Sequence, residues 1–150
     1  MTEMTSKSPL FELVFGIATG LVTVLNPLTL VHMEVASNRP VGRETISALF
    51  GLILMFVGPG LLVSIGSYIH AAQEKTAGFV LTMIGGSILV LEFPLLFIGA
   101  FSAYSGIVYR LGLPAALYML TPSPLAALTM VAAVMVRRSL RQHSIGHLNT

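Results

Sequence analysis

Residues 78–102 read GFVLTMIGGSILVLEFPLLFIGAFS, and the only ionisable side chain among these 25 residues is Glu92. A helix needs about 20 predominantly apolar residues to cross the hydrocarbon core of a bilayer. Leu, Ile, Phe and Val fill 14 of the positions. Each favours insertion by about 0.3 to 0.6 kcal/mol, whereas one charge at the helix centre costs about 2.5 to 3.5 kcal/mol. The stretch therefore predicts a transmembrane helix that carries a carboxyl group near its middle.

The rest of the chain has the same apolar character. Of the 150 residues, 55% are hydrophobic and 9% are charged, whereas an ordinary soluble domain has about 25% charged residues. Counting the stretch above, the apolar runs suggest spans at about residues 11–34, 46–70, 78–103 and 111–136. We therefore expect an all-α polytopic membrane protein, a bundle of about four transmembrane helices forming a single domain over residues 1–150.

Lysines and arginines are divided unequally between the two ends of such a bundle. With four spans, the N-terminus, the short polar turn at residues 70–75 and the C-terminus share one side. That side holds Lys7, Lys75, Arg137, Arg138 and Arg141, and the other holds Arg39, Arg43 and Arg110. Because cytoplasmic loops carry the excess of lysine and arginine, we expect an integral protein of the cell membrane with both termini in the cytoplasm.

Glycines recur at seven-residue steps on both sides of Glu92. The series consists of Gly78, Gly85, Glu92, Gly99 and Gly106. A heptad step keeps residues on one face of a helix, and glycines on one face let another backbone approach closely. We expect a helix-packing seam into which the carboxyl group points.

The first predicted span offers a matching face. Gly16 and Gly20 form a GxxxG pair, and Thr23 and Asn26 continue the same face. At about 1.5 Å of rise per residue, Thr23 lies near the depth of Glu92 and Asn26 within about one helical turn of it. The spacing predicts an intramembrane polar site of Glu92, Thr23 and Asn26.

Two interpretations of Glu92 stay open. In the first, it is a protonated acid that hydrogen-bonds to Thr23 or Asn26 and fixes which helices pack together. In the second, it takes up and releases a proton or cation during transport, a role that intramembrane acids often have. No lysine or arginine falls within a predicted span to neutralise it.

Every predicted span has at least one proline in its interior. They are Pro27, Pro59, Pro94, Pro122 and Pro124. A proline removes one amide donor and frees the carbonyl four residues earlier, so we expect kinked helices whose freed carbonyls bond to their neighbours. The alternative is a pair of broken helices lining a cavity, unwound at residues 58–60 and 121–124.

The side chains do not indicate catalysis or a metal site. The sequence has no cysteine, and His32 and His70 end consecutive spans, which places them on opposite sides of the membrane. Glu12, near one edge, is too far from Glu92, near the middle, for shared acid and base chemistry. No interleaving of basic and aromatic residues suggests nucleic acid. We expect no enzymatic activity, no metal and no cofactor.

The leading hypothesis from the sequence is a small non-enzymatic membrane protein, either a helix-packing subunit of a larger complex or a homo-oligomer. Its partners would be the lipid bilayer and other transmembrane helices. The alternative is a small proton- or cation-coupled transporter or channel that uses the carboxyl group of Glu92.

Overall fold

The computed structural model describes the backbone of residues 3–36, 50, 53–103 and 121–146. These residues form four α-helices and one short π-helix, and they include no strand. The helices are α1 (Glu3–Ala36), η1 (Ile53–Val57), α3 (Gly58–Gln73), α4 (Thr76–Ala103) and α7 (Pro122–Gly146). The all-helical class is confirmed.

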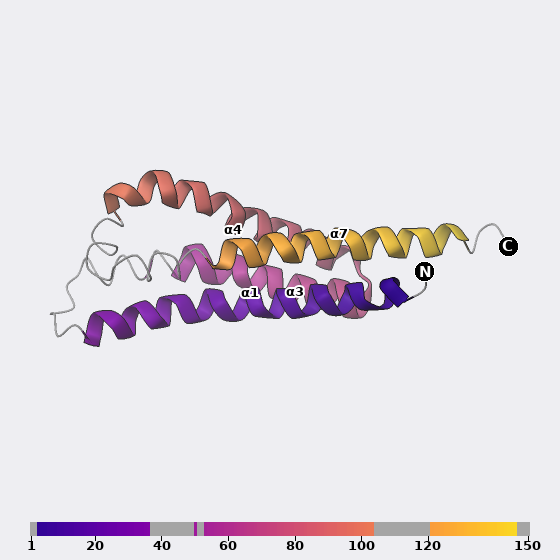
Figure 1. The fold of residues 1–150 in the computed structure, drawn as a ribbon, viewed down its shortest axis with the longest axis horizontal. Helices are drawn as coiled ribbons and strands as arrows, with labels where there is room; N and C mark the ends of the chain where they lie inside the picture. Colours follow the sequence, from indigo (N-terminus) through magenta and orange to yellow (C-terminus); the bar gives the residue numbers. More distant parts are fainter. Residues whose placement is uncertain (1–2, 37–49, 51–52, 104–120, 147–150) are drawn as a thin grey trace.

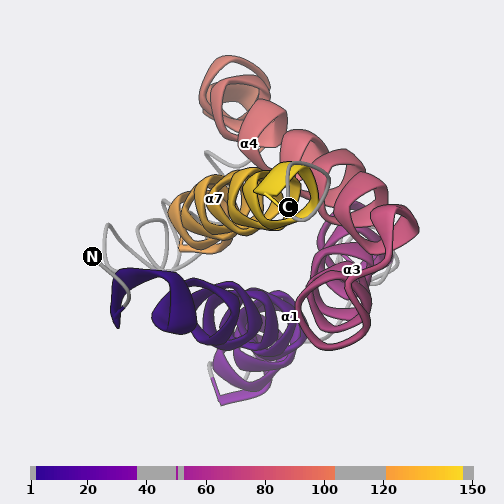
Figure 2. The same cartoon turned by 90° about the vertical axis from the view of Figure 1, so that its right-hand side faces the viewer.

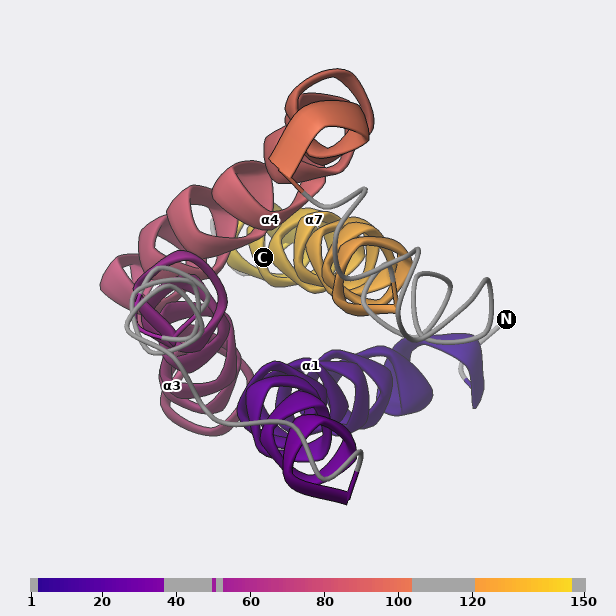
Figure 3. The same cartoon turned by 90° about the vertical axis from the view of Figure 1, so that its left-hand side faces the viewer.

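The four α-helices form an elongated up-and-down bundle (Figure 1). Seen from either end, their order around the bundle is α1, α3, α4 and α7 (Figures 2 and 3). Helix α1 packs against α3 and α7, and so does α4, so that α1 and α4 lie on opposite sides of the bundle. The start of α1, the end of α7 and the α3–α4 turn lie at the same end, which we call the termini end (Figure 1).

Two helices are long and apolar enough to cross a membrane. The stretches are Pro9–Thr29 in α1, with a mean hydropathy of 1.6, and Pro122–Gln142 in α7, with a mean hydropathy of 1.2. A shorter apolar stretch, Thr76–Leu91, belongs to α4. The number of spans stays a prediction.

Helix boundaries differ from the predicted spans at several points. Helix α1 begins at Glu3, before the predicted start near residue 11. Helix α7 continues past Val136 to Gly146, because its polar end includes arginines, which favour helix, and no proline or glycine before Gly146. Helix α3 continues to Gln73, so only Glu74 and Lys75 separate it from α4. Glu74 has a left-handed backbone with φ 54°, and its amide donates to the carbonyl of His70 at 3.0 Å. His70 therefore lies in the last turn of helix α3 and not in the connection between α3 and α4.

The prolines lie within continuous helices or at helix starts. Pro27 lies inside α1 and Pro94 inside α4 without ending either helix. Pro59 lies in the first turn of α3, which follows η1 directly, and Val57, the last residue of η1, keeps helical angles. No unwound gap therefore separates η1 from α3. Pro122 begins α7, a position where the missing amide has no intrahelical acceptor.

Among the described residues, the interior of the bundle combines polar side chains with apolar ones such as Val63 and Leu89, whereas its exterior carries many large apolar side chains. The buried polar side chains are Glu12, Thr19, Thr23, Asn26, Ser67, His70, Thr82, Ser123 and Thr129. Buried apolar residues include the small Ala126, Ala132 and Ala133. By contrast, 21 large hydrophobic side chains are exposed, and they come from every helix of the described part. An apolar surface of this extent is unusual for a monomer in water.

Candidate functional site

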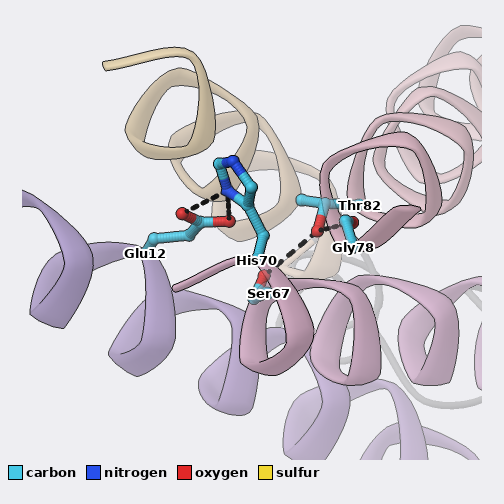
Figure 4. A network of polar contacts seen from close by, with 5 residues as sticks. All are labelled: Glu12, Ser67, His70, Gly78 and Thr82. Carbon is cyan, nitrogen blue, oxygen red and sulfur yellow. Dashed lines mark hydrogen bonds and ion pairs between the residues drawn. The ribbon is translucent and has the colours of Figure 1, made fainter. Parts of the chain in front are cut away.

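Glu12 of α1 and His70 of α3 form a buried pair near the termini end (Figure 4). Nδ1 of His70 lies 2.9 Å from both carboxyl oxygens of Glu12. The side chains are 0% exposed for Glu12 and 2% for His70. Either the Nδ1–H of the imidazole donates to the carboxylate, or a protonated carboxyl group donates to Nδ1. The pair is a hydrogen-bonded carboxyl group and imidazole held away from solvent.

Helical spacing explains why both side chains point inward. On α1, Glu12, Gly16, Thr19 and Thr23 are buried and recur at steps of three or four residues. On α3, the buried positions Val63, Gly66, Ser67 and His70 follow the same spacing. Because α1 packs on α3, these two faces meet, and the glutamate and histidine close the contact at the termini end.

Two hydroxyl groups continue the polar contacts next to the pair. Ser67, one turn before His70 on α3, has its Oγ 3.5 Å from Oγ1 of Thr82 on α4. Thr82 Oγ1 in turn donates to the carbonyl of Gly78 at 3.0 Å. Figure 4 shows these groups beside the Glu12–His70 pair, so three helices contribute polar atoms to this end of the bundle.

An aromatic ring lies next to the histidine, and an arginine lies over that ring. The ring of Phe79 lies 5.4 Å from the ring of His70, tilted by 59°. The guanidinium carbon of Arg137, on α7, lies 4.1 Å from the centre of the Phe79 ring, the geometry of a cation–π contact. Each of the four α-helices therefore contributes a side chain to this cluster, which consists of Glu12, His70, Phe79 and Arg137.

Further hydroxyl groups lie deeper in the bundle. The hydroxyl oxygens of Thr19 on α1 and Thr129 on α7 lie 3.2 Å apart, and each hydroxyl also lies within donating distance of a carbonyl of its own helix. One of them donates across the α1–α7 contact only when it gives up that carbonyl. The hydroxyl of Ser123 donates to the carbonyl of Leu89 at 2.8 Å and joins α7 to α4. Pro94 frees the carbonyl of Val90, the residue after Leu89. A neighbouring helix therefore supplies a hydrogen-bond donor close to the carbonyl that the proline frees.

Glycines of the predicted seam lie where helices approach closely. A Cβ atom at Gly20 would lie 2.8 Å from Cβ of Ser64, and one at Gly85 would lie 2.6 Å from the carbonyl oxygen of Pro59. Gly16 faces Ser67, and Gly78 faces the backbone of α3. Gly106 and the surroundings of Gly99 lie outside the described part of the chain.

The predicted polar site is only partly described. Thr23 and Asn26 are buried, and Thr23 Oγ1 donates to the carbonyl of Gly20 at 2.8 Å while lying against Gly60 of α3. Glu92 belongs to α4, but its side chain lies outside the described residues. The polar face of α1 packs on α3, and α4 lies across the bundle.

Sequence reasoning missed the pairing of Glu12 with His70. The four-span topology already puts the start of the first span and the end of the second on one side of the membrane. Glu12 and His70 are therefore expected at the same end of the bundle, which is the signal in the sequence that could have indicated the pair. The contribution of Phe79 and Arg137 had no signal in the sequence, because it depends on how α4 and α7 pack around α3.

The chemistry of the site is that of a hydrogen-bonded acid and base. No group of three or more metal-ligating side chains occurs among the described residues. A carboxyl group and an imidazole at this distance can share a proton through their hydrogen bond. No family model, curated protein or solved structure matched this chain.

Proposed function

We propose that this chain is an integral membrane protein of four transmembrane helices that transfers protons, with Glu12 and His70 as its proton-binding site. The observation that carries the proposal is the burial of a carboxyl group and an imidazole, 2.9 Å apart, inside a bundle with an apolar surface. Ionisable groups inside a membrane protein are costly to desolvate and are most often functional.

A purely structural role explains the pair less well. Replacing a buried ion pair by apolar residues of similar volume is often neutral or even stabilising. The helix contact at this position already has Gly16 against Ser67 and Gly78 against the α3 backbone. Close packing of α1, α3 and α4 therefore does not require a carboxyl group and an imidazole at the end of the contact.

The distribution of side chains supports insertion into a bilayer. Large hydrophobic residues such as Leu21, Ile65 and Met135 are 58%, 51% and 58% exposed, while the hydroxyl and amide groups face inward. Lys75, Arg138 and Arg141 are exposed at the termini end. By the positive-inside rule, we propose that this end faces the cytoplasm of a cell membrane.

Polar groups extend from the pair toward the other end of the bundle. Thr19, Thr23 and Asn26 are buried on the same face of α1 as Glu12, and Asn26 lies about 21 Å along the helix from Glu12. Glu92 lies about 20 Å along α4 from Phe79. We propose Glu92 as a second proton-binding group in the same route, which keeps the role expected for it from the sequence.

The proposal is tested by proton flux in vesicles of zwitterionic phosphatidylcholine. The purified chain is reconstituted, a pH gradient is imposed, and a pH-sensitive dye inside the vesicles reports the flux. Glu12→Gln and His70→Asn each keep a polar side chain that can form a hydrogen bond across the α1–α3 contact. Neither amide side chain takes up or releases a proton near neutral pH. We expect each to reduce the flux at least tenfold, and Glu92→Gln to reduce it as well.

Ser67→Ala is the matched control, because it removes a buried polar group next to His70 that does not titrate near neutral pH. We expect it to retain the flux of the unmodified chain. Helix content and unfolding in detergent are measured for every variant, so that loss of structure is separated from loss of function. Equal flux in the Glu12→Gln, His70→Asn and unmodified chains, or no flux in any of them, would refute the proposal.

A helix-packing subunit is the second candidate function. It is favoured by the exposed apolar side chains on all the helices, since any of them offers a surface for a partner helix. The seam glycines argue less strongly for it than they did in the sequence, because Gly16, Gly20, Gly78 and Gly85 all contact α3 of the same chain. Stoichiometric partner proteins after mild detergent extraction would support this candidate.

A further inference from the structure

The outward face of α7 changes from apolar to basic within one helical turn. Leu128, Val131 and Met135 are 49%, 58% and 58% exposed on this face. Arg138 continues the same spacing and is also exposed, and Arg141 follows three residues later. Residues three and four apart are neighbours on a helix surface, so the apolar side chains and the two arginines form one continuous strip.

The two arginines have no counter-charge within the described residues. Neither arginine takes part in an ion pair or hydrogen bond with those residues. The neighbouring Arg137, by contrast, makes a cation–π contact with the ring of Phe79. Exposed Lys75 adds a further positive charge in the α3–α4 turn, and Glu74 next to it is the exposed acid of that turn. The described part of the termini end therefore presents two exposed guanidinium groups at the place where the apolar surface stops.

We infer that the strip formed by Leu128, Val131, Met135, Arg138 and Arg141 binds an anionic phospholipid of the surrounding leaflet. The three apolar side chains would contact an acyl chain, and the two arginines would bind the phosphate. A guanidinium group offers paired donors that match phosphate oxygens. Met135 and Arg138 are only about 4.5 Å apart along the helix axis, which fits the change from hydrocarbon to headgroup.

This inference rests on the membrane insertion in the proposed function, but not on proton transfer. Each basic residue near an anionic membrane surface strengthens association by about fivefold, so two arginines give about 25-fold. The interaction should weaken as salt rises, because exposed charges are screened. A zwitterionic lipid has the same acyl chains but no net charge, and is expected to bind the strip less tightly.

The test uses the full chain in detergent and phosphatidylglycerol that carries a fluorescent acyl chain, with binding measured by anisotropy. Phosphatidylcholine with the same label is the reference lipid. We expect phosphatidylglycerol to bind at least tenfold more tightly, and Arg138→Gln with Arg141→Gln to remove most of that preference. The charge-conserving pair Arg138→Lys with Arg141→Lys should retain most of it, and Gln142→Ala, a neutral exposed neighbour, should retain it fully.

Three results would overturn the inference: equal affinity for the two lipids, unchanged selectivity in the double glutamine variant, or displacement of phosphatidylglycerol by inorganic phosphate at the same concentration. The last would indicate a site for a free anion instead of a lipid. The double glutamine variant should keep its proton flux in phosphatidylcholine vesicles, and Glu12→Gln should keep its lipid selectivity. Failure of one proposal is therefore distinguishable from failure of the other.

Discussion

Gly78→Ala is expected to force α3 and α4 apart. A Cβ atom at this position would meet backbone atoms of α3, among them the amide nitrogen of His70, the carbonyl oxygen of Gly66 at 2.6 Å and the carbonyl carbon of Ile69 at 2.8 Å. Favourable contacts between carbon atoms are about 3.5 to 4.0 Å, so the two helices must separate by roughly 1 Å.

The size of the destabilisation depends on which atoms the new methyl group meets. Overpacking a well-packed site costs about 1 to 3 kcal/mol, and the upper end applies here because helix backbone cannot rotate aside as a side chain can. Alanine offsets part of this, since it is about 0.5 to 1 kcal/mol better than glycine inside a helix. We expect the free energy of unfolding to fall by about 2 kcal/mol.

The measurement is unfolding in mixed micelles by sodium dodecyl sulfate, followed by circular dichroism. Two other glycines calibrate it. A Cβ atom at Gly58 would meet nothing within 4 Å, and one at Gly20 would lie 2.8 Å from the side chain of Ser64. We expect no loss for Gly58→Ala and an intermediate loss for Gly20→Ala. If Gly78→Ala is as stable as the unmodified chain, the backbone contact between α3 and α4 is not as close as described.

Two further predictions concern side chains of the bundle interior. Phe79→Ala should raise severalfold the rate at which diethyl pyrocarbonate modifies His70, because the ring next to the imidazole is removed. The rate is measured by mass spectrometry. Phe11→Ala, on the exposed face of α1, should leave the rate unchanged, and equal rates in both variants would show that Phe79 does not shield His70. Thr19→Val and Thr129→Val should show a coupling energy of about 0.6 kcal/mol in a double-mutant cycle of unfolding, as is usual for hydrogen bonds between membrane helices. Strict additivity would indicate that the two hydroxyl groups do not bond.

The helices and their inward faces could be predicted from the sequence for a clear physical reason. A run of about 20 apolar residues specifies a helix long enough to cross a bilayer, and the residue spacing specifies which side chains share a face. Gly16, Gly20, Thr23 and Asn26 were assigned to one face of the first span, and all four are buried in the bundle.

Which helix covers that face could not be predicted in the same way. Spacing within α1 says nothing about its neighbour, so depth alone suggested the glycine face around Glu92. The bundle instead puts α3 between α1 and α4, and Gly60 of α3 lies against Thr23. The same missing information concealed the Glu12–His70 pair, since two side chains 58 positions apart meet only once the order of the helices is known.

The position of the pair along the bundle determines what else a proton route needs. Glu12 lies three residues after the start of the apolar stretch Pro9–Thr29, or about 4.5 Å inside it. In the proposed function, a proton enters from the termini end, where Phe79 lies next to His70 and Arg137 lies over Phe79, and most of the hydrocarbon thickness still lies ahead of it. The pair alone cannot connect the two sides of a membrane. A route across the bilayer must use groups farther along the bundle, and a second titratable group at the depth of Glu92 is what the proposed function requires.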